Sequence, residues 1–118
     1  MDWKLSDDRP IWIQLVEQLT RRIVSGEYPP GSRLPAVREL AADAGVNPNT
    51  MQRALAQLEA DGLAVTNRTA GRTVTQDGEA IAAIRRRVAR EVTAEYLAPL
   101  AELGYTRNDV VKLLEEET

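Results

Sequence analysis

The chain has 118 residues, of which 43% are hydrophobic and 28% charged, and its formal net charge is −3. These values fit one globular domain, or a small domain with an appendage, and argue against wholesale disorder. Cysteine and histidine are both absent, which excludes a disulfide framework and a thiolate metal site and leaves little scope for histidine-based catalysis, so we expect no metal, no cofactor and no enzyme activity.

Residues 1–9 are expected to form an N-terminal arm, in which Trp3 and Leu5 anchor either on the body of the chain or on a partner. The segment from Pro10 to Gly26 has helical periodicity, with a proline in the first turn and a glycine as its stop. Its buried face is predicted to consist of apolar residues one helical turn apart, namely Trp12, Leu15, Val16, Leu19 and Ile23.

The next segment, YPPGSR at residues 28–33, contains two prolines and a glycine that cannot continue a helix, so it predicts a turn. Leu34 is expected to lie in a very short extended element. Pro35 then opens a second helix that Gly45 ends. The inward face of this helix is predicted to hold Val37, Leu40, Ala41 and Ala44.

A third helix is predicted after the tight turn Gly45-Val46-Asn47 and extends to Gly62. Asn47 can accept hydrogen bonds from the first free N–H groups, and Pro48 suits the first helical position. Two helices joined in this way form a helix-turn-helix pattern. The side chains at helical spacing divide into an apolar face, with Met51, Ala54, Leu55 and Leu58, and an opposite face with Asn49, Gln52, Arg53, Ala56, Gln57 and Ala60.

The opposite face has an unusual composition for a solvated helix. Such faces are commonly rich in Glu and Lys, which pair along the helix. Here amides and an arginine stand beside small alanines. Amides can form two hydrogen bonds with adenine and arginine can do so with guanine, while alanines let a helix approach a groove wall. The pattern therefore favours DNA reading over a merely solvated face.

Two β-compatible runs, residues 63–65 and 73–75, follow the third helix and are separated by a glycine-containing turn. A β-hairpin in this position is the wing of a winged helix. Arg68 and Arg72 are expected at its tip, where a basic side chain could reach a phosphate or a narrow minor groove. An ordinary solvated loop remains an alternative for each arginine.

These segments together resemble the N-terminal DNA-binding domain of the GntR family of bacterial transcription regulators, and more narrowly its YtrA-like subfamily. The similarity covers about residues 9 to 76 and is carried by PPGSRLP, VREL, NPNT and LEADGL in this order, with the wing AGRTVT. The resemblance implies that Arg38 contacts DNA near the start of the motif and that Gly71 of the wing approaches the minor groove. It further implies that Asn49, Thr50 and Gln52 face bases or phosphates. The chain departs from the family at Ala36, where serine is common.

Residues 77–118 predict a helical hairpin. Asp77 is expected to cap a long helix that Pro99 bends and Gly104 ends, and Thr106 to cap a last helix. A hairpin of this size buries its apolar stripe poorly alone, so we expect the same hairpin of a second chain to cover it. The resemblance agrees, because YtrA-like regulators have short helical dimerisation elements. The predicted dimerisation residues are Ile81, Ile84, Val88, Val92, Tyr96, Leu100, Leu103, Val110, Leu113 and Leu114.

The basic run of Arg85, Arg86 and Arg87, with Arg90, lies in the long helix. A solvated face paired with glutamates is the favoured interpretation, and an extension of the phosphate contacts is the alternative. An effector ligand between two subunits is a further hypothesis, because the chain has no room for an effector-binding domain.

The fold expected from these elements is mainly α with a small β-wing, a winged helix-turn-helix in residues 1–76 followed by a two-helix dimerisation element in residues 77–118. The expected function is that of a dimeric repressor on a palindromic operator, with a winged-helix protein-interaction module as the alternative. A cytoplasmic location is expected, because the N-terminus lacks a signal pattern and no run approaches the roughly 18 apolar residues of a membrane span. The predicted DNA-binding residues are Arg33, Arg38, Asn47, Asn49, Thr50, Gln52, Arg53, Arg68, Gly71 and Arg72.

Overall fold

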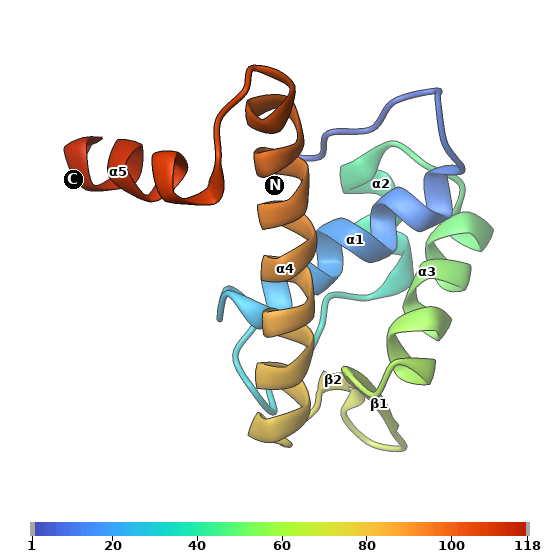
Figure 1. Ribbon diagram of the computed structural model, residues 1–118. Helices are drawn as coiled ribbons and strands as arrows, with labels where there is room; N and C mark the ends of the chain where they lie inside the picture. The colour runs from blue at the N-terminus through green and yellow to red at the C-terminus, as the bar shows by residue number, and fades with distance from the viewer. Residues whose placement is uncertain (1, 118) are drawn as a thin grey trace. The chain divides into compact units, whose positions relative to one another are not determined.

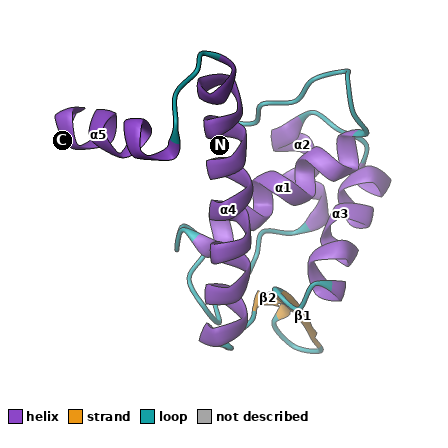
Figure 2. Ribbon diagram, in the orientation of Figure 1, coloured by secondary structure: helices purple, strands orange, loops and turns teal. Residues whose placement is uncertain are grey.

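A computed structural model describes residues 2–117, and within them five helices and one two-stranded antiparallel sheet follow one another along the chain. Figures 1 and 2 show the predominance of helix. The mainly α fold with a small β-wing is thereby confirmed. In chain order the elements are α1 (Ile11–Val24), α2 (Val37–Ala44), α3 (Pro48–Ala60), β1 (Ala64–Asn67), β2 (Gly71–Val74), α4 (Gly78–Glu102) and α5 (Arg107–Glu117).

Two compact units divide the chain, Met1–Arg85 and Arg86–Thr118, and the division falls within α4. The first unit contains α1, α2, α3, the β1–β2 hairpin and the first turns of α4. The second contains the rest of α4 and α5. A boundary at residue 76 was expected from the sequence, whereas the contacts place the first turns of α4 with the winged helix.

Residues that cap the helix ends fix the turn of the helix-turn-helix. Gly45 ends α2 in the left-handed region, with φ at 71°. The Asn47 side chain then accepts a hydrogen bond of 2.8 Å from the Asn49 N–H, and Pro48 occupies the first helical position of α3. Because both helix ends are capped within three residues, the turn between the two helices has little freedom. The predicted turn is confirmed.

The start of α2 was predicted too early, because this helix begins at Val37 and not at Pro35. The backbone N–H of Leu34 donates to the Arg72 carbonyl at 2.9 Å, and Arg33 pairs with Thr73 as an isolated bridge beside the hairpin. These bonds hold the chain extended against the wing, so a helix cannot begin until they end. The very short extended element predicted at Leu34 is confirmed.

The core of the first unit is built where α1, α2 and α3 meet the base of the hairpin. Leu15, Leu19 and Ile23 of α1 are buried as predicted, while Trp12 and Val16 are only half-buried. Ile81 of α4 joins the same core and Ile84 packs against it. The remaining buried apolar residues of this core are Val24, Leu34, Leu40, Ala41, Met51, Ala54, Leu55, Leu58, Leu63, Ala64 and Val74.

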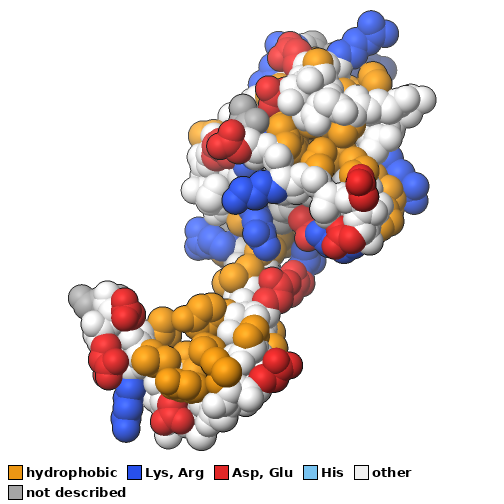
Figure 3. All heavy atoms as spheres, turned by 90° about the horizontal axis from the view of Figure 1, so that it is seen from above, with side chains coloured by type: hydrophobic (Ala, Val, Ile, Leu, Met, Phe, Trp, Pro, Cys, Tyr) orange, Lys and Arg blue, Asp and Glu red, His pale blue; other side chains and the backbone are white. Residues whose placement is uncertain are grey.

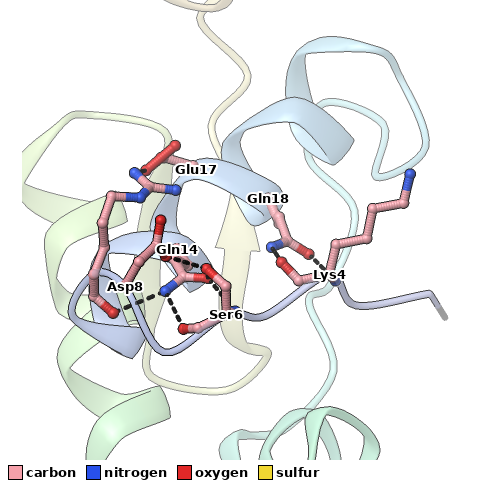
Figure 4. A network of polar contacts seen from close by, with 7 residues as sticks. Lys4, Ser6, Asp8, Gln14, Glu17 and Gln18 are labelled. Atoms are coloured by element: carbon pink, nitrogen blue, oxygen red, sulfur yellow. Dashed lines mark hydrogen bonds and ion pairs between the residues drawn. The ribbon is translucent and has the colours of Figure 1, made fainter.

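The N-terminal arm packs on the body of its own chain. Trp3 and Leu5 are half-buried against the core, and the Trp3 indole N–H donates to Asp43 at 2.8 Å. Gln14 is a buried amide in the first turn of α1, and its Nε2 donates to the carbonyls of Ser6 and Arg9, both at 2.8 Å. Figure 4 shows this network along the arm. A polar residue is tolerated in the apolar face of α1 because the arm satisfies its hydrogen bonds.

In the second unit, a local capping pattern fixes the start of α5. Thr106 and Asp109 form a reciprocal cap at the start of α5, in which each backbone N–H bonds the other residue's side chain, at 2.9 and 3.2 Å. Val110 is buried, whereas several large apolar residues of this unit are exposed. Figure 3 shows apolar side chains gathered over α5 and the end of α4. The exposed large apolar residues here are Val92, Tyr96, Leu103, Tyr105, Val111 and Leu114.

Candidate nucleic-acid interface

The outward face of α3 is the centre of the candidate interface. Met51, Ala54, Leu55 and Leu58 show no exposed surface, so the inner face of the helix is fixed in the core. On the other side Asn49, Gln52, Arg53, Ala56 and Ala60 are exposed. A helix held this firmly presents its polar side chains in a fixed frame, as reading the edges of bases requires.

The hydrogen-bonding groups on this face are mostly unused within the chain. In residues 2–117 the Gln52 amide and the Arg53 guanidinium make no hydrogen bond or ion pair. Gln57 differs, because its amide donates to Asp61 at 3.0 Å. Thr50 is half-buried and Asn49 is exposed beside it. The free groups are therefore concentrated in the first half of the helix, where the sequence predicted reading.

Arg53 has a neighbour that sequence reasoning missed. Its guanidinium lies over the indole ring of Trp12 in α1, with 4.1 Å between Cζ and the ring centroid. The two residues are distant in the chain, so no local signal could reveal the pair. A cation above an aromatic face is held by the ring quadrupole.

Arg33 and Arg38 flank the start of α2. Both side chains are exposed, and in the described residues neither makes a hydrogen bond or ion pair. A hollow of about 320 Å³ lies here, lined by Arg33, Leu34, Pro35, Ala36 and Glu39. The side chain of Arg33 also runs beside Gly71 of the wing, and a Cβ built on that glycine would lie 3.8 Å from Arg33 Nε. The two arginines thus provide free cations near the start of α2, and Arg33 also lies beside the wing.

Arg68 lies at the tip of the wing, in the turn between β1 and β2. The Asn67 side chain accepts the backbone N–H groups of Thr69 and Ala70, at 3.1 and 3.3 Å, and so closes the turn. Gly71 follows with φ at 76°, a backbone conformation that few other residues adopt readily. The tip is therefore built by an asparagine turn and a glycine, and it carries one exposed arginine.

The placement of Arg72 at the tip was wrong. Arg72 is the second residue of β2, opposite Thr66, and its Nε donates to Glu59 Oε1 of α3 at 2.7 Å. The same carboxylate oxygen accepts the Thr66 hydroxyl. These bonds, that of Thr66 above all and then that of Arg72, lower the pKa of Glu59 below its usual value. Arg72 is consequently part of a clamp between α3 and the wing, which sequence spacing could not reveal.

The predicted dimerisation residues do not form one surface. Ile81 and Ile84 pack on the core of the first unit, and Val110 is buried within the second. Their side chains pack within the chain itself, and contact of the predicted dimerisation residues with a partner stays a prediction. Those with exposed or half-exposed side chains are Val88, Val92, Tyr96, Leu100, Leu103, Leu113 and Leu114.

In residues 2–117 no group of three or more acidic side chains could hold a metal ion. None of the described helices is both long and apolar enough to cross a bilayer. Arg87 lies 3.7 Å from Glu91 one helical turn along α4, in keeping with a solvated face.

Comparison with known proteins gives consistent matches. The model for bacterial regulatory proteins of the gntR family matches residues 13–74. The HTH-type transcriptional regulator YhcF of Bacillus subtilis (strain 168) is 33% identical over 112 residues, covering 95% of this chain and 93% of that protein. The HTH-type transcriptional repressor YtrA of the same organism is 36% identical over 70 residues, 59% of this chain and 54% of that protein.

A solved structure supports the same relationship. A GntR family transcriptional regulator from Listeria monocytogenes superposes with a TM-score of 0.85 at 32% identity. The match covers 95% of this chain and 98% of that one, and therefore includes both compact units.

Proposed function

The chain belongs to the GntR family of bacterial DNA-binding transcription regulators, and from this premise we propose that it acts as a dimeric repressor that binds a two-fold symmetric operator. Each winged helix binds one half-site, and the dimer excludes other proteins from the promoter. The half-sites are separated by roughly one helical turn of DNA or a multiple of it. The relative named YtrA is a repressor, which supports this direction of control.

The observation that carries the proposal is the outward face of α3. Gln52 and Arg53 offer unpaired donors there, while the opposite side of the helix is fixed in the core. We infer that Asn49, Thr50 and Gln52 read base edges. Arg33, Arg38 and Arg68 contact phosphates and set the register, and Gly71 lets the wing approach the minor groove.

The exposed apolar residues of the second unit support the proposed dimer. Tyr96, Leu103 and Leu114 are 55%, 72% and 50% exposed. Large apolar side chains gathered on one face (Figure 3) favour association with a partner. A second copy is the simplest partner, because a two-fold interface uses the same surface twice. Any effector would then bind between subunits.

A protein-interaction module without DNA reading is the second candidate. Interaction surfaces are enriched in large apolar and aromatic residues at their centre. The outward face of α3 carries amides, an arginine and alanines instead. This composition favours DNA.

Selection of bound duplexes from a random pool tests the proposed function. We expect the wild-type protein to enrich one sequence with two-fold symmetry. Gln52→Ala should relax preference at one base pair per half-site, by about 1 to 3 kcal/mol. Arg38→Ala should weaken binding to all sequences alike and reduce the salt slope by about 1 per subunit. Arg107→Ala, a change in the exposed start of α5, is the matched control. Failure to enrich any sequence would refute DNA reading.

The dimer is tested separately by sedimentation. Leu103→Glu places a charge on the apolar face of the second unit and should shift the protein toward monomer. Val65→Glu places the same charge on an exposed apolar residue of the first unit, 50% exposed, and should leave the assembly unchanged. A wild-type protein that sediments as a monomer at all concentrations would overturn the proposed dimer.

A further inference from the structure

Trp12 and Arg53 connect the start of α1 to the outward face of α3. Trp12 is the second residue of α1 and half-buried, while Arg53 is exposed. Leu15 of α1 and Leu55 of α3 are fully buried in one core, so the two helices do not move independently. The indole therefore provides a fixed platform for the guanidinium, 4.1 Å above it.

A stacked guanidinium keeps its hydrogen-bonding capacity. Its five N–H donors lie in the plane of the group, whereas contact with an aromatic ring uses its face. Within the described chain no acceptor occupies these donors on Arg53. Contact with the ring restricts the guanidinium and leaves its N–H donors without an acceptor in the chain, and such free donors are what two parallel hydrogen bonds to guanine require.

The platform also reduces the entropy that DNA binding removes. Immobilising one long, flexible side chain at an interface weakens binding by a factor of about two to ten. Arg38 has no aromatic ring beneath it in the described residues and must lose this freedom on binding. Arg53 has lost much of it in the free protein.

We propose that Trp12 is a positioning residue for sequence reading, holding Arg53 so that its N–H edge selects guanine at one base pair of each half-site. This inference rests on the proposed function. It assigns specificity to a residue of α1, outside the helix-turn-helix.

The test is a coupling experiment on the selected operator. Binding of Trp12→Leu, Trp12→Phe, Arg53→Ala and the Trp12→Leu/Arg53→Ala double variant is measured by fluorescence anisotropy. The probes are the operator and a duplex with the Arg53-dependent guanine changed to adenine. Trp12→Leu should lose about three- to tenfold in affinity for the operator and little for the changed duplex. Trp12→Phe, which keeps an aromatic face, should restore most of the loss.

Two further results separate positioning from a merely structural role. In the Arg53→Ala background Trp12→Leu should change affinity by less than about twofold, because its effect acts through Arg53. The salt slope of Trp12→Leu should equal that of wild type, since no phosphate contact is lost. Equal losses on both duplexes, or the same loss with and without Arg53, would overturn the proposal.

Failure of the positioning role can be distinguished from failure of the proposed function. In a Trp3→Phe background Trp12 is the remaining tryptophan, so a change in its emission on Arg53→Ala reports the stack in the free protein. A wild-type protein that selects no DNA refutes both proposals. A wild-type protein that selects an operator, with Trp12→Leu retaining full discrimination, refutes the positioning role alone. Thermal unfolding of each variant verifies folding, and if Trp12→Leu unfolds, unchanged Trp12 emission on Arg53→Ala would still overturn the stack on which the positioning role rests.

Discussion

Replacing Glu59 by glutamine should weaken DNA binding, even though the change removes a negative charge from beside the wing. The Glu59 carboxylate joins α3 to both strands of the hairpin, because it accepts bonds from Arg72 of β2 and Thr66 of β1. If Arg72 contacted phosphate instead, removing the nearby acid would strengthen binding. The two interpretations therefore predict changes of opposite sign.

The magnitude follows from the exposure of the pair. The side chains of Arg72 and Glu59 are 17% and 30% exposed, so solvent screens their attraction only in part. A pair of this kind contributes about 1 kcal/mol. The wing has only two strands of four residues each and little stability of its own. We expect Glu59→Gln to lower the free energy of unfolding by about 1 kcal/mol and DNA affinity by up to about fivefold.

The assay is salt-titrated anisotropy on the selected operator, together with chemical denaturation. Arg72→Gln and the Glu59→Gln/Arg72→Gln double variant complete a double-mutant cycle, in which the second change should add little. Glu39→Gln is the matched control, since Glu39 is exposed and in the described chain has no bonded partner. It should bind slightly tighter. The clamp is refuted if Glu59→Gln also binds tighter, or if Arg72→Gln lowers the salt slope by about 0.9 per subunit.

Three further predictions concern stability. The pKa of Glu59 is held below its usual value of 4.5 by Thr66 and then Arg72. The clamp therefore contributes its full stability above that pH and loses it as the pH falls through the lowered pKa. The free energies of unfolding of wild type and Glu59→Gln should converge in acid, and a difference that stays constant with pH would contradict this. Asn47→Ala should lower the free energy of unfolding in urea by about 1 kcal/mol, and Asn47→Asp, which can still cap α3, should retain most of it. Gly71→Ala should destabilise by about 1 to 2 kcal/mol because φ is 76° there, whereas Gly78→Ala, at the start of α4 with nothing within 4 Å of its Cβ, should not; equal effects in thermal unfolding would contradict the conformational explanation.

Local signals made the helix-turn-helix predictable from the sequence. The cap at Asn47, the left-handed glycine at position 45 and the buried stripe from Met51 to Leu58 each depend on residues within one or two turns of each other. Such features are encoded in spacing alone, because they involve only the geometry of one helix and its ends. The same holds for the cap of α4, where Asp77 accepts the N–H groups of Glu79 and Ala80, at 3.0 and 3.2 Å.

Features that depend on contacts between distant segments were missed. Whether Arg72 lies at the tip or in the strand depends on where the turn closes, and a shift of one residue reverses the face of the side chain. The stripe of α4 is continuous in sequence, yet its first members, Ile81 and Ile84, complete the core of the winged helix. The platform under Arg53 requires Trp12, 41 positions earlier. No periodicity within one element contains this information.

The net charge of residues 33 to 72 does not show which of their arginines are free to contact DNA. Between residues 33 and 72 five arginines stand against four acidic residues, which is nearly neutral by count. The Glu59–Arg72 pair joins one charge of each sign and leaves this count unchanged, while Asp61 and Asp43 keep their charges and accept hydrogen bonds from Gln57 and Trp3. Within the described residues the side chains of the remaining arginines, Arg33, Arg38, Arg53 and Arg68, make no hydrogen bond or ion pair with the chain.

Specific placement can therefore replace bulk charge at this interface. If Arg33, Arg38 and Arg68 meet phosphates in each subunit of a dimer, the logarithm of the binding constant should fall against that of salt concentration with a slope of about −5. A slope set by net charge would be close to zero, because the whole chain is acidic. Salt titration of the wild-type protein distinguishes the two, and a near-zero slope would mean that these free arginines do not face DNA.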